Sequence, residues 1–173
     1  MPITSLNHTL DTWIAALQGY DFDLLLIKPA ADDWSLGQVF IHLLHETNYY
    51  AGQIEACLKQ QENTNGQMAE AAQMMFANNA LPEERIQGDP QSAQKVLQPS
   101  SKAALLAQMQ ALKTRLNTLW SDIVDHESAG KTQHPGLGYF NAMEWLQFAD
   151  MHLRHHLRQK SRIEAALKIA RDQ

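Results

Sequence analysis

The sequence predicts an all-α protein, a four-helix bundle with a long irregular crossover between the second and third main helices. Apolar residues recur at intervals of three and four in four long segments, the spacing that places them on one face of a helix. Good helix formers such as Ala, Leu and Gln are abundant, whereas Val and Ile are too sparse to supply a sheet. A chain of 173 residues has the usual size of one compact domain, so we expect residues 1–173 to form a single domain.

The first two main helices are expected over residues 5–20 and 35–60, separated by turn-forming residues at 21–33. Ser35 can cap the second helix, and Gln38 three residues later completes a capping-box pattern. The apolar face of the first helix comprises Leu6, Leu10, Trp13, Ile14 and Leu17. The inward stripe of the second is predicted to comprise Gln38, His42, His45, Tyr49, Gly52 and Ala56.

The middle of the chain is less regular. We expect a short helix over residues 68–76 and an irregular crossover over residues 81–100, which contains three prolines. A connection of this length allows the helices on either side of it to run parallel. The third main helix is expected over residues 101–124, with a core face of Leu105, Met109, Leu112, Leu116, Leu119 and Ile123.

The fourth main helix is expected over residues 141–169, after a loop at 126–138. Asn141 is a good N-cap, and Glu144 stands three residues later. The helix carries an inward stripe of Trp145, Phe148, His152, His156, Gln159 and Ile163.

Composition excludes several classes of function. The net charge of −5 argues against a nucleic-acid partner, which requires a basic surface. Cys57 is the only cysteine, so an intrachain disulfide is impossible and a reducing compartment is expected. The polar first ten residues lack the core of a signal peptide, and no stretch approaches the roughly 18 apolar residues of a membrane span. We therefore expect a cytoplasmic protein with no membrane partner.

Three of the four histidines on the predicted inward stripes form a candidate metal site. His152 and His156 are four residues apart on one helix and point the same way, and His42 lies on another helix. His155 is adjacent to His156, so only one of the two can face inward. Burial of three neutral imidazoles is unfavourable unless each has a partner, and a divalent ion such as Zn, Ni or Fe is a suitable one. We predict a three-histidine metal site with open coordination positions, as in catalytic sites. The histidines not expected to be ligands are His8, His126 and His134.

His45 competes with His42, because both lie on the same predicted face. It could be a fourth ligand, a group that orients the ligands, or a catalytic acid/base. Glu46 and Asp150 flank the ligand histidines in sequence but are expected to project away from the stripes. His45 is therefore the best candidate for acid/base catalysis. The remaining alternative is a bundle whose histidines are packed without a metal.

Two segments resemble a known family. Residues 34–43, WSLGQVFIHL, look like the second-helix signature of the DinB/YfiT-like superfamily. Residues 134–162, HPGLGYFNAMEWLQFADMHLRHHLRQKSR, are similar to its last-helix motif, H-x-x-x-H followed by Gln. The resemblance implies a four-helix bundle, a homodimer, and a metal site at His42, His152 and His156.

The resemblance also implies a class of reaction. The family includes bacillithiol transferases, a mycothiol-dependent isomerase and proposed hydrolases. It implies a metal-dependent enzyme that activates a low-molecular-weight thiol, or water, for transfer to a small-molecule electrophile. Hydrolysis usually needs a general base beside the water, and the shortage of such a group favours thiol S-transfer. The alternatives are a metal-dependent hydrolase and a non-catalytic, stress-related metal-binding bundle.

Overall fold

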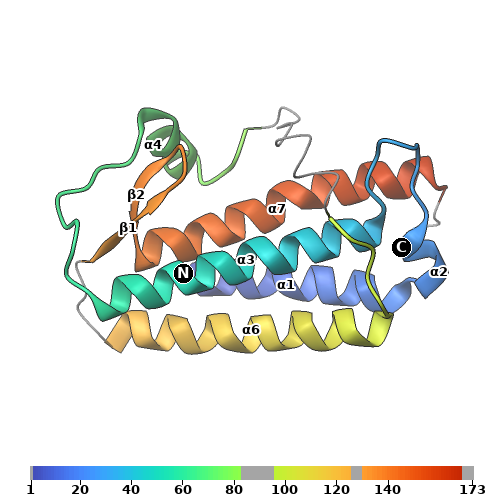
Figure 1. Ribbon diagram of the computed structural model, residues 1–173, viewed down its shortest axis with the longest axis horizontal. Helices are drawn as coiled ribbons and strands as arrows, with labels where there is room; N and C mark the ends of the chain where they lie inside the picture. Colours follow the sequence, from blue (N-terminus) through green and yellow to red (C-terminus); the bar gives the residue numbers. More distant parts are fainter. Residues whose placement is uncertain (1, 83–95, 126–129, 169–173) are drawn as a thin grey trace.

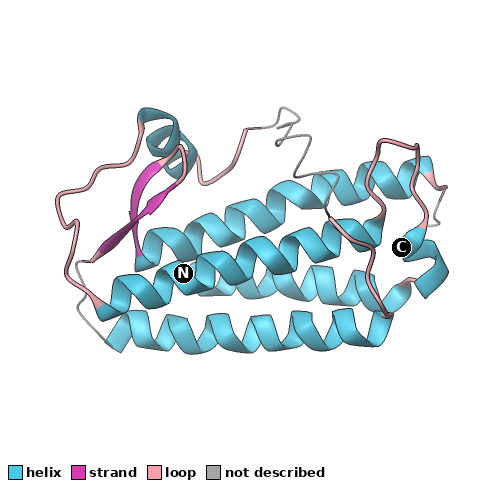
Figure 2. Cartoon of the chain, viewed as in Figure 1, coloured by secondary structure: helices cyan, strands magenta, loops and turns pink. Residues whose placement is uncertain are grey.

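Four long helices dominate the computed structural model, which describes residues 2–82, 96–125 and 130–168. They are α1 (Pro2–Gly19), α3 (Leu36–Lys59), α6 (Lys102–Asp125) and α7 (Ala142–Ala166) (Figure 1). The smaller elements are α2 (Phe22–Leu26), α4 (Glu70–Ala77) and the strands β1 (Lys131–His134) and β2 (Gly138–Asn141) (Figure 2). The predicted all-α four-helix bundle is thus confirmed. The expected crossover at 81–100, the loop at 126–138 and the end of the last helix at 169 lie partly outside the described residues.

Both predicted capping boxes are present. The Ser35 hydroxyl accepts a hydrogen bond from the backbone N–H of Gln38 at 3.1 Å, and the Gln38 side chain accepts one from the Ser35 N–H at 3.1 Å. Asn141 and Glu144 make the same reciprocal pair at 2.8 and 2.7 Å. These bonds satisfy N–H groups that have no partner within the helix, and they fix where α3 and α7 begin.

The four long helices do not simply alternate in direction along the chain. α7 packs against α3 and α1, and α6 packs against the same two helices. In Figure 1, α3 and α6 run in one direction, and α1 and α7 run in the other. The long connection between α3 and α6 makes this parallel pair possible, as the sequence predicted.

The apolar faces predicted for the first and third helices lie in the core, which they share with residues of α3 and α7. Trp13 is fully buried, packs edge-on against Phe40 at 5.2 Å between ring centroids, and donates its indole N–H to the Leu153 carbonyl at 3.2 Å. No helix within the described ranges is apolar over a stretch long enough to cross a membrane. The buried residues of these two predicted faces are Leu6, Leu10, Trp13, Leu17, Leu105, Met109, Leu112, Leu116 and Leu119.

A two-stranded hairpin stands where the sequence predicted a loop. β1 and β2 pair in antiparallel register directly before α7. The turn requires glycine at Gly138, where φ is +84° and a Cβ atom would lie 2.5 Å from a neighbouring backbone carbonyl. Trp145 of α7 donates its indole N–H to the Thr132 hydroxyl at 2.7 Å. The hairpin thereby places His134 on the aromatic residues at the start of α7, with its ring stacked on Trp145 at 5.5 Å.

Candidate metal centre

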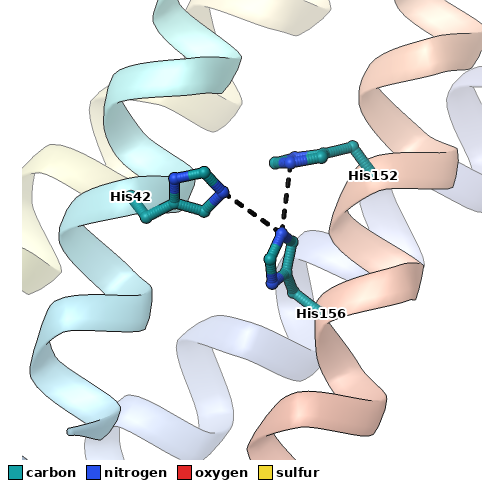
Figure 3. A group of neighbouring side chains, drawn as sticks. All are labelled: His42, His152 and His156. Carbon is teal, nitrogen blue, oxygen red and sulfur yellow. Dashed lines mark hydrogen bonds between the residues drawn. The ribbon is translucent and has the colours of Figure 1, made fainter. Parts of the chain in front are cut away.

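Three imidazole rings converge between α3 and α7. His42 comes from α3, and His152 and His156 come from successive turns of α7 (Figure 3). The Nε2 atom of His156 lies 3.2 Å from the Nε2 atom of His42 and 3.2 Å from that of His152. One ring nitrogen from each residue lies within 4.8 Å of the other two. The structure therefore brings together the three histidines that the sequence selected.

Burial keeps these three rings neutral. Desolvation, and then the neighbouring His156 and His45, lower the pKa of His42 to about 3. Desolvation also lowers the pKa of His156 to about 4 and that of His152 well below its usual value. The group therefore presents neutral imidazoles near pH 7, the form in which histidine binds a metal.

The contacts at the Nε2 atom of His156 fit a cation better than a hydrogen-bonded histidine cluster. A neutral imidazole has one donor nitrogen and one acceptor nitrogen with a single lone pair. The Nε2 atom of His156 has two imidazole neighbours at the same distance, so one lone pair cannot fully satisfy both contacts. Tetrahedral coordination at about 2.05 Å would place ligand nitrogens roughly 3.3 Å apart, close to the observed spacing. Three imidazole donors suit Zn, Ni or Fe.

The nitrogen of His156 that faces away from the group is already engaged. Its Nδ1–H donates to the Gln159 side-chain oxygen at 2.7 Å. This bond fixes the tautomer in which Nε2 carries the lone pair, the usual arrangement at metal-bound histidines. His152 is 8% exposed, and its Nδ1 atom has no hydrogen-bond partner among the described residues. On the α3 side, the Trp34 ring lies 5.1 Å from the His42 ring.

His45 is not part of this group. Its side chain is 81% exposed, and its Nδ1 atom lies 3.2 Å from the Glu46 carboxylate. The buried face of α3 is centred on residues such as Leu43 and Thr47. The inward face predicted through His45 is therefore wrong, because it is rotated around the helix from the face that is buried. His42 stands at the edge of the buried face, and His45 points to solvent beyond that edge. The described structure therefore offers no fourth histidine ligand.

Glu46 contacts an aromatic residue that packs against the site. One turn after His42, its carboxylate accepts a hydrogen bond from the Tyr50 hydroxyl at 3.3 Å. The Tyr50 ring in turn meets the His152 ring edge-on at 5.6 Å. Burial, and then the charge of Glu46, raise the pKa of Tyr50. Burial lowers the pKa of His134 on the hairpin, and the charge of Glu46 opposes that shift. The four-residue spacing from His42 to Glu46, the same as that from His152 to His156, was the signal that could have located this carboxylate.

The other acid considered from the sequence has a structural role. The Asp150 carboxylate accepts hydrogen bonds from the hydroxyls of Ser5 at 2.7 Å and Thr9 at 2.8 Å, and from Arg154 at 3.1 Å. The hydrogen bonds from Ser5 and Thr9 join α7 to α1, so Asp150 is engaged in packing these two helices. Cys57 is buried and its pKa is raised by that burial, so its thiol is a poor nucleophile.

Comparison with known proteins identifies the family. The DinB superfamily matches residues 5–159, most of the chain, and the chain belongs to that superfamily. Among solved structures, the chain is similar to YfiT from Bacillus subtilis, with a TM-score of 0.69 and 14% sequence identity, over 98% of this chain and 87% of that one. YfiT is described as "a probable metal-dependent hydrolase with an unusual four-helix bundle topology". No protein of curated function matches the sequence significantly.

Proposed function

We propose that this member of the DinB superfamily is a metal-dependent hydrolase of small molecules in which His42, His152 and His156 hold one divalent ion. The observation that carries the proposal is the convergence of three neutral imidazole nitrogens, 3.2 Å apart in two pairs, from two helices. Such an ion, when bound, polarises a substrate oxygen and lowers the pKa of water or of a thiol. Three protein ligands leave coordination positions open for chemistry.

Glu46 is the group we assign to proton transfer. Its carboxylate lies one turn from His42 and against Tyr50, which packs on His152. It can accept a proton from water held beside the three histidines, and the Tyr50 hydroxyl holds it in place. His45, selected from the sequence for the same role, contacts the Glu46 carboxylate at 3.2 Å. We therefore assign His45 as a partner that orients Glu46 from the solvent side.

This carboxylate removes the reason for which the sequence favoured thiol S-transfer. That preference depended on the shortage of a general base beside the histidines. Hydrolysis also agrees with the description of YfiT, which shares the fold. The low-molecular-weight thiol and the homodimer stay predictions from the family resemblance, and the cytoplasmic location stays a prediction from the composition.

A structural metal site is the competing proposal. Closed structural zinc sites have four protein ligands, often cysteines. Here the described residues offer three histidines, Cys57 is buried elsewhere beside the hairpin, and His45 faces solvent. The donor set therefore supports an open, catalytic site.

The test begins with metal analysis of protein purified without an affinity tag. A panel of small esters and amides is then assayed with and without added thiols. We expect hydrolysis that needs no thiol, and a loss of roughly 100- to 10,000-fold in kcat for Glu46→Gln, the usual contribution of a general base. Glu62→Gln, which removes an exposed carboxylate beyond the end of α3, is the matched control and should retain activity. Turnover that depends on an added thiol would instead establish the transferase.

A further inference from the structure

A cavity of about 160 Å³ lies beside the three histidines, between the segment that precedes α3 and the last turns of α7. Its walls include Trp34 on one side and Gln159, Arg162 and Ile163 on the other. Sites that enclose a whole small-molecule ligand usually measure roughly 300–1,000 Å³, so this cavity has room for one end of a ligand.

Two of its walls are shared with the histidine group. The Trp34 ring that lines the cavity lies 5.1 Å from the His42 ring. The Gln159 side chain that lines it accepts the hydrogen bond of His156 at 2.7 Å. A molecule whose reacting bond lies at the histidines can therefore extend one end into this cavity.

The cavity contains a cation that is available to a ligand. Arg162 is exposed and makes no hydrogen bond or ion pair with another described residue. Its charge acts on the histidines, since it contributes to the lowered pKa values of His155 and His156. Asp33, the acidic residue in the wall, already has an interaction of its own within the structure. A free guanidinium in a small, partly apolar cavity is suited to bidentate recognition of a carboxylate or a phosphate.

We propose that this cavity binds an anionic group of the substrate, a carboxylate or a phosphate, through Arg162, with the Trp34 ring against one face of that end. The inference depends on the proposed function for the position of the reacting bond, but the anion site itself is independent of the metal. The expected substrates are therefore small anionic esters or amides. In a chain with a net charge of −5, an arginine that has no partner among the described residues and lies beside the histidines provides a local attraction for such molecules.

The first experiment uses the metal-free protein, residues 1–173. Inorganic phosphate and acetate are titrated separately, and binding is followed by the NMR shift of the Trp34 indole N–H and by calorimetry. Arg162→Gln should weaken binding of the preferred ion by roughly 10- to 100-fold, as expected for loss of hydrogen bonds to a charged group. Arg158→Gln is the matched control, because it removes the same charge from α7 one turn earlier, at a residue outside the cavity wall. The stronger of the two ions identifies whether phosphate or carboxylate is preferred.

The second experiment uses metal-loaded protein and a pair of esters that differ by one carboxylate. Arg162→Gln should lower the ratio of kcat/KM for the anionic ester to that for the neutral ester by roughly 10- to 100-fold. Arg158→Gln should leave this ratio unchanged. No binding of either ion to the wild type, or an equal loss in both variants, would overturn the anion site. Absence of metal binding by the wild type would instead refute the proposed function, and it would leave the result of the anion titration intact.

Discussion

Replacement of His156 by alanine should abolish metal binding and leave the bundle folded. The side chain supplies the Nε2 atom that contacts both other rings, and its Nδ1–H bonds Gln159. The ring is partly exposed, whereas Trp13, Phe40 and the other large core side chains are fully buried. We therefore expect a loss of about 1–3 kcal/mol in the free energy of unfolding, typical of a point mutation that removes packing and a hydrogen bond. For a chain of this length, that loss lowers Tm by roughly 2–12 °C.

The metal contributes a second, separable effect. In the wild type, free metal at about 100 times its Kd stabilises the folded state by about 2.7 kcal/mol, or roughly 5–11 °C in Tm. His156→Ala should lose this increase, because removal of a ligand weakens binding by more than the roughly 10- to 100-fold caused by loss of a ligand's hydrogen-bond partner. His155→Ala is the matched control. That imidazole is the next residue of α7, contacts Arg158, and is not among the three converging rings.

The assay is thermal melting of the wild type, His156→Ala and His155→Ala, each with added metal and with chelator, together with calorimetric titration of the metal. The reasoning requires that chelated wild type keep its helical signal and that only His156→Ala fail to respond to metal. Loss of the helical signal on chelation would refute it, because metal-binding free energy would then be folding free energy and the site would be structural. An equal response of the two variants would refute the ligand assignment.

Two further predictions concern the same histidines, and a third concerns the oligomeric state. Gln159→Leu should weaken metal binding by roughly 10- to 100-fold, measured by calorimetry, because it removes the acceptor that fixes the His156 tautomer; unchanged affinity would contradict this role. Metal-free protein should lose stability as the pH falls from about 6.5 toward 4, because the pKa values of His42 (about 3) and His156 (about 4) lie below the unfolded value, so the unfolded chain binds more protons. The check is Tm against pH, and a His42→Gln/His156→Gln double variant should show a flatter curve than the wild type. The homodimer implied by the family resemblance predicts a dimer mass in light scattering at micromolar concentration, and a monomer alone would exclude it.

The sequence was sufficient for the helices because each depends on local signals. The capping boxes at Ser35 and Asn141 are made by residues three positions apart, and the structure contains both. The apolar spacing of the first and third helices marks faces that are wide and strongly hydrophobic. The hairpin before α7 was missed because its strands have four residues each and little alternation of polarity. Their stability depends on contacts with distant parts of the chain, such as the indole N–H of Trp145 on Thr132.

The site was harder to predict on α3 than on α7. His152 and His156 lie on one helix, and their spacing alone orients them together. On α3 the position of the stripe depends on which residues the neighbouring helices cover, and these contacts are not visible in the sequence. An error of less than one turn was enough to place His45 inward and Glu46 outward. In the structure His45 is exposed and Glu46 is partly buried against Tyr50, and this position of Glu46 is the basis for proposing it as the general base.

His42 lies at the edge of the buried face of α3, so the histidine group adjoins the core that stabilises the fold and is not part of it. A histidine placed at the centre of that face, at the position of Leu43 or Thr47, would point its Nε2 atom into a core without room for a substrate. At the edge, His42 still meets the two histidines of α7, one side of the group faces the cavity at Arg162, and Tyr50 and Glu46 lie on the other. We therefore expect that, in the proposed hydrolase, substitutions around these rings alter the choice of substrate without disturbing the Trp13 core.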